Sequence, residues 1–180
     1  MKTRLAFVAS IFLLVASPAA IGGQHQGWKK TSDIGVAMLV VSSLAVPAAQ
    51  EDWQGFRQAV YSDALGEGVA LLGKSLIHEE RPNHRDDKSF PSGHATLAFA
   101  AATTMYRRYG WQAGFPAYAV AALTGVARVE AREHHWWDVA AGAAFGMGSG
   151  WLMTHPINDR VQIMPWVGDK GGGIALSMTF

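Results

Sequence analysis

The sequence predicts an all-helical bundle that ends in a small β-hairpin. Between Leu65 and Leu76, apolar side chains recur at steps of three and four residues, the spacing of one face of a helix. Residues 31–33, Thr-Ser-Asp, stand before an apolar segment, where such side chains cap helices. Over 174–180, apolar residues alternate with smaller or more polar ones, as in a strand.

The first twenty residues have the pattern of a secretory signal peptide. Lys2 and Arg4 precede an apolar run of twelve residues, Leu5 to Ala16, which is short for a membrane span, and Ser17-Pro-Ala19 offers a cleavage site. An uncleaved N-terminal anchor is the alternative. We expect an exported protein, periplasmic or attached to the envelope, with a signal peptide over 1–20, a single domain over 21–180, a core over 31–156 and a C-terminal hairpin over 160–180.

Composition limits the classes of function. Loss of Lys2 and Arg4 would leave 13 basic residues against 14 acidic ones, a net charge of −1, so we expect no nucleic-acid partner. The chain has no cysteine and therefore no disulfides. With 49% hydrophobic residues in 180, a core is available to hold the fold together.

The helices are expected in the following order. The first spans 34–49, after its capping residues, and could be a buried helix or a short membrane helix. A mixed segment, 51–57, leads to the second helix, 59–76. A polar loop over 78–90 follows, and loops of this kind often carry function.

The later elements continue this pattern. Pro91 suits the first turn of the third helix, which ends at the basic residues before Gly110. The fourth helix spans 111–127, and the last runs from about His134 to Met153 and is rich in alanine and glycine. The hairpin strands are expected at 161–167 and 174–180, on either side of a glycine-rich turn.

Two clusters of unusual chemistry favour an anion. The helix that follows Pro91 begins with free N–H groups, a serine hydroxyl at Ser92 and an approachable backbone at Gly93, although an ordinary helix cap gives the same tetrapeptide with His94 on the surface. Lys74, Arg81 and Arg128 are singly typical surface charges. Together they would neutralise the three oxygens of a phosphoryl group. Nearby Arg85, Lys88 and Arg132 are interpreted as surface residues.

The third cluster contains two candidate nucleophiles. His134 and Asp138 are four residues apart, so on a helix the carboxylate could accept the Nδ1–H of the ring and leave Nε2 free to attack. His135 is three residues from Asp138, so spacing alone leaves both histidines open. We expect no metal and no other cofactor, because standard ligand motifs are absent and three cations would repel an ion.

These clusters resemble the signature of the type 2 phosphatidic acid phosphatase and vanadium haloperoxidase superfamily. Its motifs, Lys-x6-Arg-Pro, Pro-Ser-Gly-His and Ser-Arg-x5-His-x3-Asp, occur here in order and spacing, except that Ala127 replaces the usual serine. The resemblance implies the family's helical bundle and a metal-independent phosphatase with a phosphohistidine intermediate. It implies His134 as nucleophile, Asp138 as its orienting group and His94 as acid and base. For His135 we then prefer a role behind the site or in packing beside Trp136 and Trp137. The resemblance also implies phosphate binding by Lys74, Arg81, Ser92, Gly93 and Arg128.

The substrate is a second question. Family members act on lipid phosphates, prenyl diphosphates or soluble monoesters, and the apolar segments and tryptophans favour a lipid-linked phosphate monoester at a membrane surface. Three alternatives stay open: a soluble non-specific acid phosphatase, a vanadium haloperoxidase, although those chains are usually much longer, and a non-catalytic envelope protein. The sequence does not give the oligomeric state.

Overall fold

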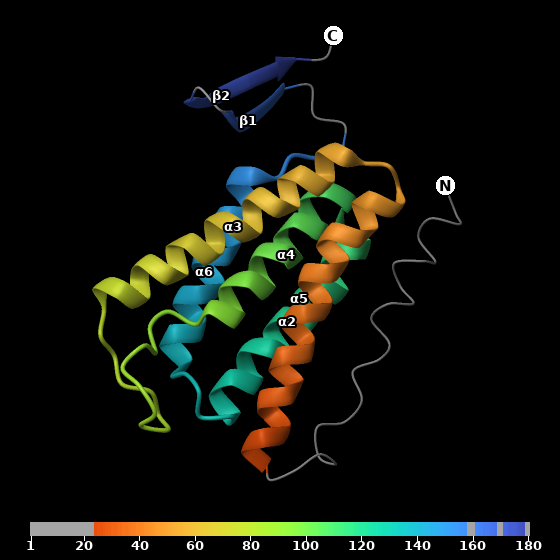
Figure 1. Ribbon diagram of the computed structural model, residues 1–180. Coiled ribbons are helices and arrows are strands. Elements are labelled where there is room, and N and C mark those ends of the chain that lie inside the picture. Colours follow the sequence, from red (N-terminus) through yellow and green to blue (C-terminus); the bar gives the residue numbers. More distant parts are fainter. Residues whose placement is uncertain (1–23, 158–160, 169–170, 179–180) are drawn as a thin grey trace.

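A computed structural model describes residues 24–157, 161–168 and 171–178, and these form five helices and one hairpin (Figure 1). The helices are α2 (Gln24–Ala49), α3 (Trp53–Leu76), α4 (Gly93–Tyr109), α5 (Trp111–Glu130) and α6 (Trp136–Met153). The strands β1 (Val161–Gly168) and β2 (Gly171–Met178) pair antiparallel. The predicted helical class with a C-terminal hairpin is thus confirmed. The predicted signal peptide lies outside the described residues.

Helix α4 lies at the centre of the bundle and packs against the other four helices (Figure 1). Its buried side chains are small, mostly alanine and threonine, so neighbouring backbones approach closely. On α6, Gly142, Gly146 and Gly150 face it at four-residue steps, and a Cβ at Gly150 would lie 2.5 Å from the Cβ of Thr103. Helices α4 and α6 therefore pack through close contact between small residues rather than through large side chains.

Helix α2 begins ten residues earlier than the sequence predicted. The capping residues expected before Ile34 lie inside the helix, where Thr31 and Ser32 donate their hydroxyls to helix carbonyls at 3.0 and 2.7 Å. Tertiary contacts hold the extra turns: His25 Nδ1 lies 2.8 Å from the carbonyl of Glu130. This correction matters because it carries polar residues of α2 to the site.

Three other helix starts also differ from the prediction. Helix α3 begins at Trp53, because Asp52 caps it by accepting the amide of Gly55 at 3.0 Å. Helix α4 begins at Gly93 with Ser92 as its N-cap, so Pro91 precedes the helix and is not in its first turn. Helix α6 begins at Trp136 rather than near His134, since the residue before Trp136 is its N-cap.

The fold brings five helix ends together. At one end of the bundle, α3 and α5 end, α4 and α6 begin, and the first turns of α2 lie alongside (Figure 1). The N-termini of α2, α4 and α6 therefore lie in the same region, where the positive ends of helix dipoles favour negative charge. Among the described residues, α2 is the one helix long and apolar enough to cross a bilayer, a test that helices buried in protein cores also pass.

Candidate active site

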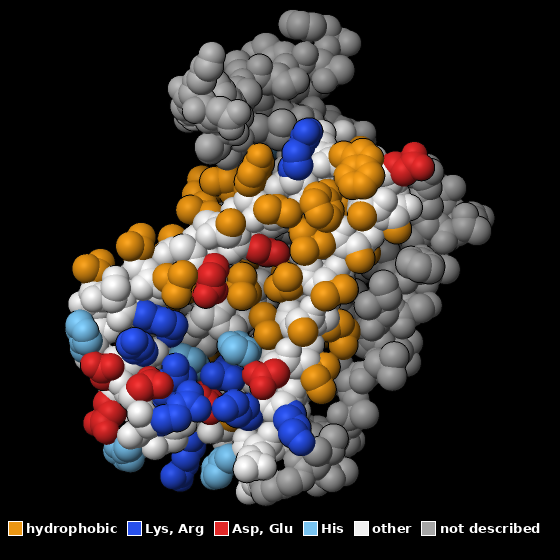
Figure 2. All heavy atoms as spheres, in the orientation of Figure 1, with side chains coloured by type: hydrophobic (Ala, Val, Ile, Leu, Met, Phe, Trp, Pro, Cys, Tyr) orange, Lys and Arg blue, Asp and Glu red, His pale blue; other side chains and the backbone are white. Residues whose placement is uncertain are grey.

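A cavity of about 420 Å³ lies at this end of the bundle. Figure 2 shows most of the charged side chains on the visible face gathered at the same end. The lining residues are Lys29 and Asp33 of α2, Glu67 and Lys74 of α3, Arg81 and Arg85 of the next loop, Gly93, His94 and Leu97 of α4, Arg128 of α5, and Glu133 and His134 of the last loop. Of the residues predicted for the site, Ser92 and Asp138 do not line the cavity.

Two of the predicted cations are held by the loop between α3 and α4. Lys74 Nζ donates to the carbonyls of Pro91 at 2.6 Å and Lys88 at 3.0 Å. Arg81 Nε donates to Asp86 Oδ1 at 2.6 Å. Burial lowers the pKa of Lys74, and the positive charge of Arg81 lowers it further. Both cations line the cavity.

The third cation, Arg128, is buried in the last turn of α5. Its Nη1 donates to Ser32 Oγ at 3.3 Å and lies 3.5 Å from Asp33 Oδ1. Its Nε is buried and has no hydrogen-bond partner among the described residues. The residue also lines the cavity, so its guanidinium adds positive charge there.

Glu133 organises the cations, and sequence reasoning missed it. Its side chain is only 5% exposed, and its Oε2 lies 3.2 Å from Arg81, 2.9 Å from Arg85 and 3.5 Å from Arg128. Burial raises the pKa of Glu133, but the surrounding cations outweigh burial and hold the pKa below its usual value. Arg85 is half exposed, as expected of a surface residue, but it also lines the cavity.

The N-terminus of α4 supplies backbone donors. Its first intrahelical bond runs from the amide of Thr96 to the carbonyl of Ser92 at 3.0 Å, so the preceding amides are free of intrahelical partners. Ser92 is fully buried, and its hydroxyl accepts the amide of Ala95 at 3.4 Å. Gly93 and His94 line the cavity, whereas Ser92 caps the helix beneath them.

His134 is fixed in one tautomer by two partners. Its Nδ1 lies 2.8 Å from the carbonyl of Ser89, which can only accept, so Nδ1 carries the proton. Its Nε2 lies 3.4 Å from Arg81 Nη1, which can only donate, so Nε2 presents its lone pair. Burial lowers the pKa of His134 to about 4, and nearby cations act in the same direction.

Asp138 does not hold His134 in the predicted way. His134 lies before α6, so the two residues do not share a helical face, and Asp138 Oδ2 is 3.7 Å from Nδ1, too far for a hydrogen bond. That oxygen instead accepts the hydroxyl of Ser89 at 2.5 Å and the amide of His135 at 2.8 Å. Ser89 thus links the two residues, and nothing in the local sequence marked it.

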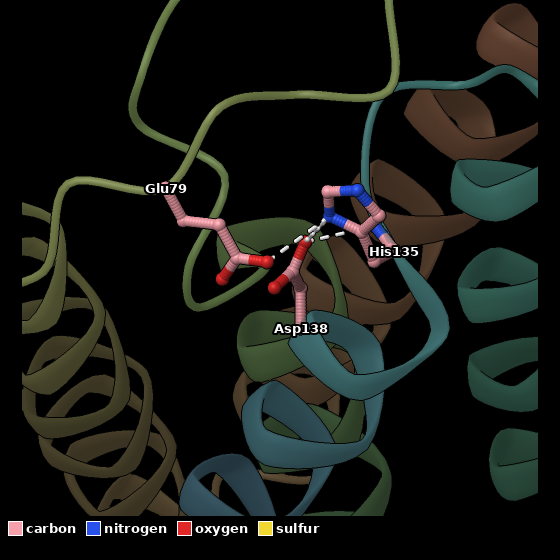
Figure 3. Close-up of side chains that lie close together, drawn as sticks. All are labelled: Glu79, His135 and Asp138. Carbon is pink, nitrogen blue, oxygen red and sulfur yellow. Dashed lines mark hydrogen bonds and ion pairs between the residues drawn. The ribbon is translucent and has the colours of Figure 1, made fainter.

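His135 belongs to a different cluster, shown in Figure 3. Its Nδ1 lies 3.2 Å from Glu79 Oε1 and 3.3 Å from Asp138 Oδ2, and its ring stacks on Trp137. The potential ligand atoms of Glu79, His135 and Asp138 lie within 4.8 Å of one another and could hold a metal ion. Hydrogen bonds already account for the arrangement, because Trp137 Nε1 donates to Glu79 at 2.6 Å.

The chain belongs to the PAP2 superfamily, whose family model matches residues 53–162, more than half of the sequence. This confirms the resemblance found in the three clusters. Ala127, the one departure from the motif, is fully buried and does not line the cavity.

Relatives and solved structures agree with this assignment. The lipid A 4′-phosphatase of Helicobacter pylori strain J99 is 33% identical over 120 residues, which are 61% of this chain and 61% of the relative. The crystal structure of Aquifex aeolicus LpxE gives a TM-score of 0.63 at 19% identity, covering 81% of this chain and 93% of that one. The crystal structure of a transmembrane PAP2-type phosphatidylglycerolphosphate phosphatase from Bacillus subtilis gives 0.54 at 21% identity, covering 84% and 83%. These two structures bear on the fold alone.

Proposed function

We propose that the chain is a phosphatase that hydrolyses phosphate monoesters through a phosphohistidine on His134. The observation that supports it best is one cavity containing a neutral imidazole with an unprotonated Nε2, a second imidazole and a cluster of cations. A nucleophile, a proton donor and charge neutralisation are what phosphoryl transfer requires. No metal is needed for this scheme.

In the first half of the reaction, Nε2 of His134 attacks phosphorus in line with the leaving oxygen. The N–P bond forms as the P–O bond to the alcohol breaks, and the electron pair of that bond goes to the alcohol oxygen. His94 gives its Nε2 proton to this oxygen, so a neutral alcohol leaves. His134 suits the attack because its pKa, lowered by burial to about 4, keeps it neutral at ordinary pH.

In the second half, His94 is neutral and takes a proton from water. The water oxygen attacks phosphorus, the N–P bond breaks, and its electron pair returns to Nε2 of His134. Inorganic phosphate is released and His94 carries its proton again. The two halves therefore balance, and both histidines return to their starting states.

Lys74, Arg81 and Arg128 would hold the phosphoryl oxygens in both halves, with the amides that begin α4. Charge spreads over these oxygens in the transition state, where fixed cations act most strongly. The presence of all three cations in the lining of one cavity supports this role. Ser89 and Asp138 would act indirectly, by fixing the ring of His134.

We further propose that the substrate is a lipid-linked phosphate at a membrane surface. Apolar side chains stand exposed around the charged end: Ile34 is 56% exposed, Leu76 78% and Trp136 68%. Above the charged end, apolar side chains spread over α2 and α3 (Figure 2). The lipid substrate in the name of the Helicobacter relative supports this choice over a soluble monoester. Such a site fits an exported, envelope-associated protein.

The test is phosphate release by the purified protein from lipid A, phosphatidic acid, a prenyl phosphate and soluble monoesters. His134→Ala, prepared in the same way, is the matched control for contaminating phosphatase. We expect release from at least one lipid phosphate by the wild type and none by the variant. Release only from soluble monoesters would overturn the lipid proposal, and no release from any substrate would overturn the function.

A further inference from the structure

His94 has a hydrogen-bond partner that lies outside the three motifs from which the site was predicted. Its Nε2 donates to Asp33 Oδ1 at 2.9 Å, although 61 residues separate the two. Arg128 Nη1 lies 3.5 Å from the same oxygen. One carboxylate oxygen on α2 therefore contacts two donors that the proposed mechanism assigns to the phosphate group of the substrate.

We propose that Asp33 is a positioning residue for His94, an inference that rests on the proposed phosphatase function. Asp33 keeps Nε2 of His94 directed into the cavity and places a negative charge beside the ring. The ring then holds its proton until the leaving oxygen of the substrate takes Asp33's place as acceptor.

The surroundings of His94 show why such a charge is needed. Burial lowers the pKa of His94, and Arg128 lowers it further, whereas Asp33 and Glu133 act in the opposite direction. An imidazolium is therefore unfavourable here without a carboxylate in contact. The charged groups that share its cavity are Lys29, Lys74, Arg81, Arg85 and Arg128, opposed by Asp33, Glu67 and Glu133, with His134 as the other titratable group. From α6, packed against α4, Asp138 accepts the amide of Ser92 at its carbonyl, at 3.0 Å.

The position of Asp33 is built into the fold. Ser32, its neighbour, accepts Arg128 Nη1 at 3.3 Å, and Lys29, one turn earlier, pairs with Glu133 at 3.4 Å. At Gly35, α2 packs so closely on α5 that a Cβ would collide with the hydroxyl of Thr124. These contacts fix the rotation of α2, while the Asp33 side chain itself is 47% exposed and free to give way to a substrate.

The contribution of Asp33 to the rate should be greatest for substrates whose leaving oxygen must be protonated. An alkyl phosphate releases a strongly basic alkoxide and depends on His94. A nitrophenyl phosphate releases a stable anion and depends on it little. Both substrates depend equally on the cations and on His134. Leaving-group dependence therefore separates an effect on His94 from a general loss of site structure.

The experiment measures kcat/KM against pH for both substrates in wild type and Asp33→Asn. For the alkyl phosphate, we expect the alkaline limb of the pH profile to shift to lower pH by about one unit. This is the lower end of the range of pKa shifts caused by losing a neighbouring opposite charge. Above that limb the alkyl phosphate should lose about tenfold, and the nitrophenyl phosphate less than about threefold. Asp33→Glu keeps the charge and should restore the limb.

Glu67→Gln is the matched control, because it removes one carboxylate from the same cavity but none that contacts His94. It should leave the ratio between the two substrates unchanged. Asp33→Ser, with melting temperatures for all variants, serves if Asp33→Asn does not fold. Equal losses on both substrates, or no change in Asp33→Asn, would overturn the inference. A wild type inactive on every phosphoester would overturn the phosphatase function instead.

Discussion

Single alanine substitutions of the adjacent residues His134 and His135 should affect the rate very differently. His134 is 2% exposed, lines the cavity and has an unprotonated Nε2, whereas His135 stacks on Trp137 outside the lining. His134→Ala should abolish the covalent intermediate and cost at least ~10³ in rate, the scale for losing a nucleophile. His135→Ala should cost far less. Asp138→Asn should fall between them, because the Ser89 carbonyl still fixes the ring.

The expected pH dependence of the attack follows from the pKa of His134. With a pKa of about 4 for His134, about 90% of the rings are neutral at pH 5; an ordinary histidine, with a pKa of 6.5, would be only about 3% neutral. The nucleophile should therefore be almost fully available at pH 5 and half available near pH 4. His135→Ala should keep the same profile, since His135 takes no part in the attack.

The assay is a single turnover with a phosphoester carrying labelled phosphate, quenched in alkaline detergent. A phosphohistidine contains a P–N bond, so the label should survive alkali and be lost in acid. Label in His134→Ala combined with none in His135→Ala would refute the assignment. A midpoint for labelling near pH 6.5 would refute the reasoning that burial and cations keep His134 neutral.

Four further predictions concern metal, stability and processing. Activity should survive excess chelator; complete loss that one divalent ion restores would contradict the mechanism. Burial raises the pKa of Asp63 from 3.8 to about 7, so the folded state binds this proton more tightly than the unfolded chain. The free energy of unfolding should therefore fall by roughly 2.5 kcal/mol between pH 5 and pH 8, a decrease that denaturation curves of Asp63→Asn should lack but those of exposed Asp87→Asn should keep. Gly146→Ala should cost about 1–3 kcal/mol in the same assay because its Cβ would strike the carbonyl of Thr96, whereas Gly148→Ala, with open space, should not destabilise. N-terminal sequencing of the mature protein should begin near Ala20, and a chain that starts at Met1 would exclude cleavage.

Local signals in the sequence determined the helical class and predicted most residues of the candidate site. The spacing of apolar residues, the alternation near the C-terminus and the alanine- and glycine-rich last helix are properties of neighbouring residues, and the structure follows them. The resemblance to the family motifs predicted Lys74, Arg81, Arg128, His94 and His134 for the site, and the structure places all five in the lining of one cavity. The distances and hydrogen-bond partners of these residues could not be predicted in this way.

Tertiary structure decided which partner each group has. Glu133 joins three arginines, Ser89 fixes His134, and Asp33 contacts His94, all through contacts across 45 or more residues or between different segments. Such pairs leave no periodic trace along the chain. The predicted start of α2 was wrong for a related reason. A capping side chain at 31–33 expresses a local preference, but packing of α2 against α5 extends the helix beyond it toward the N-terminus. Burial, which only the folded chain produces, then lowers the pKa of both histidines.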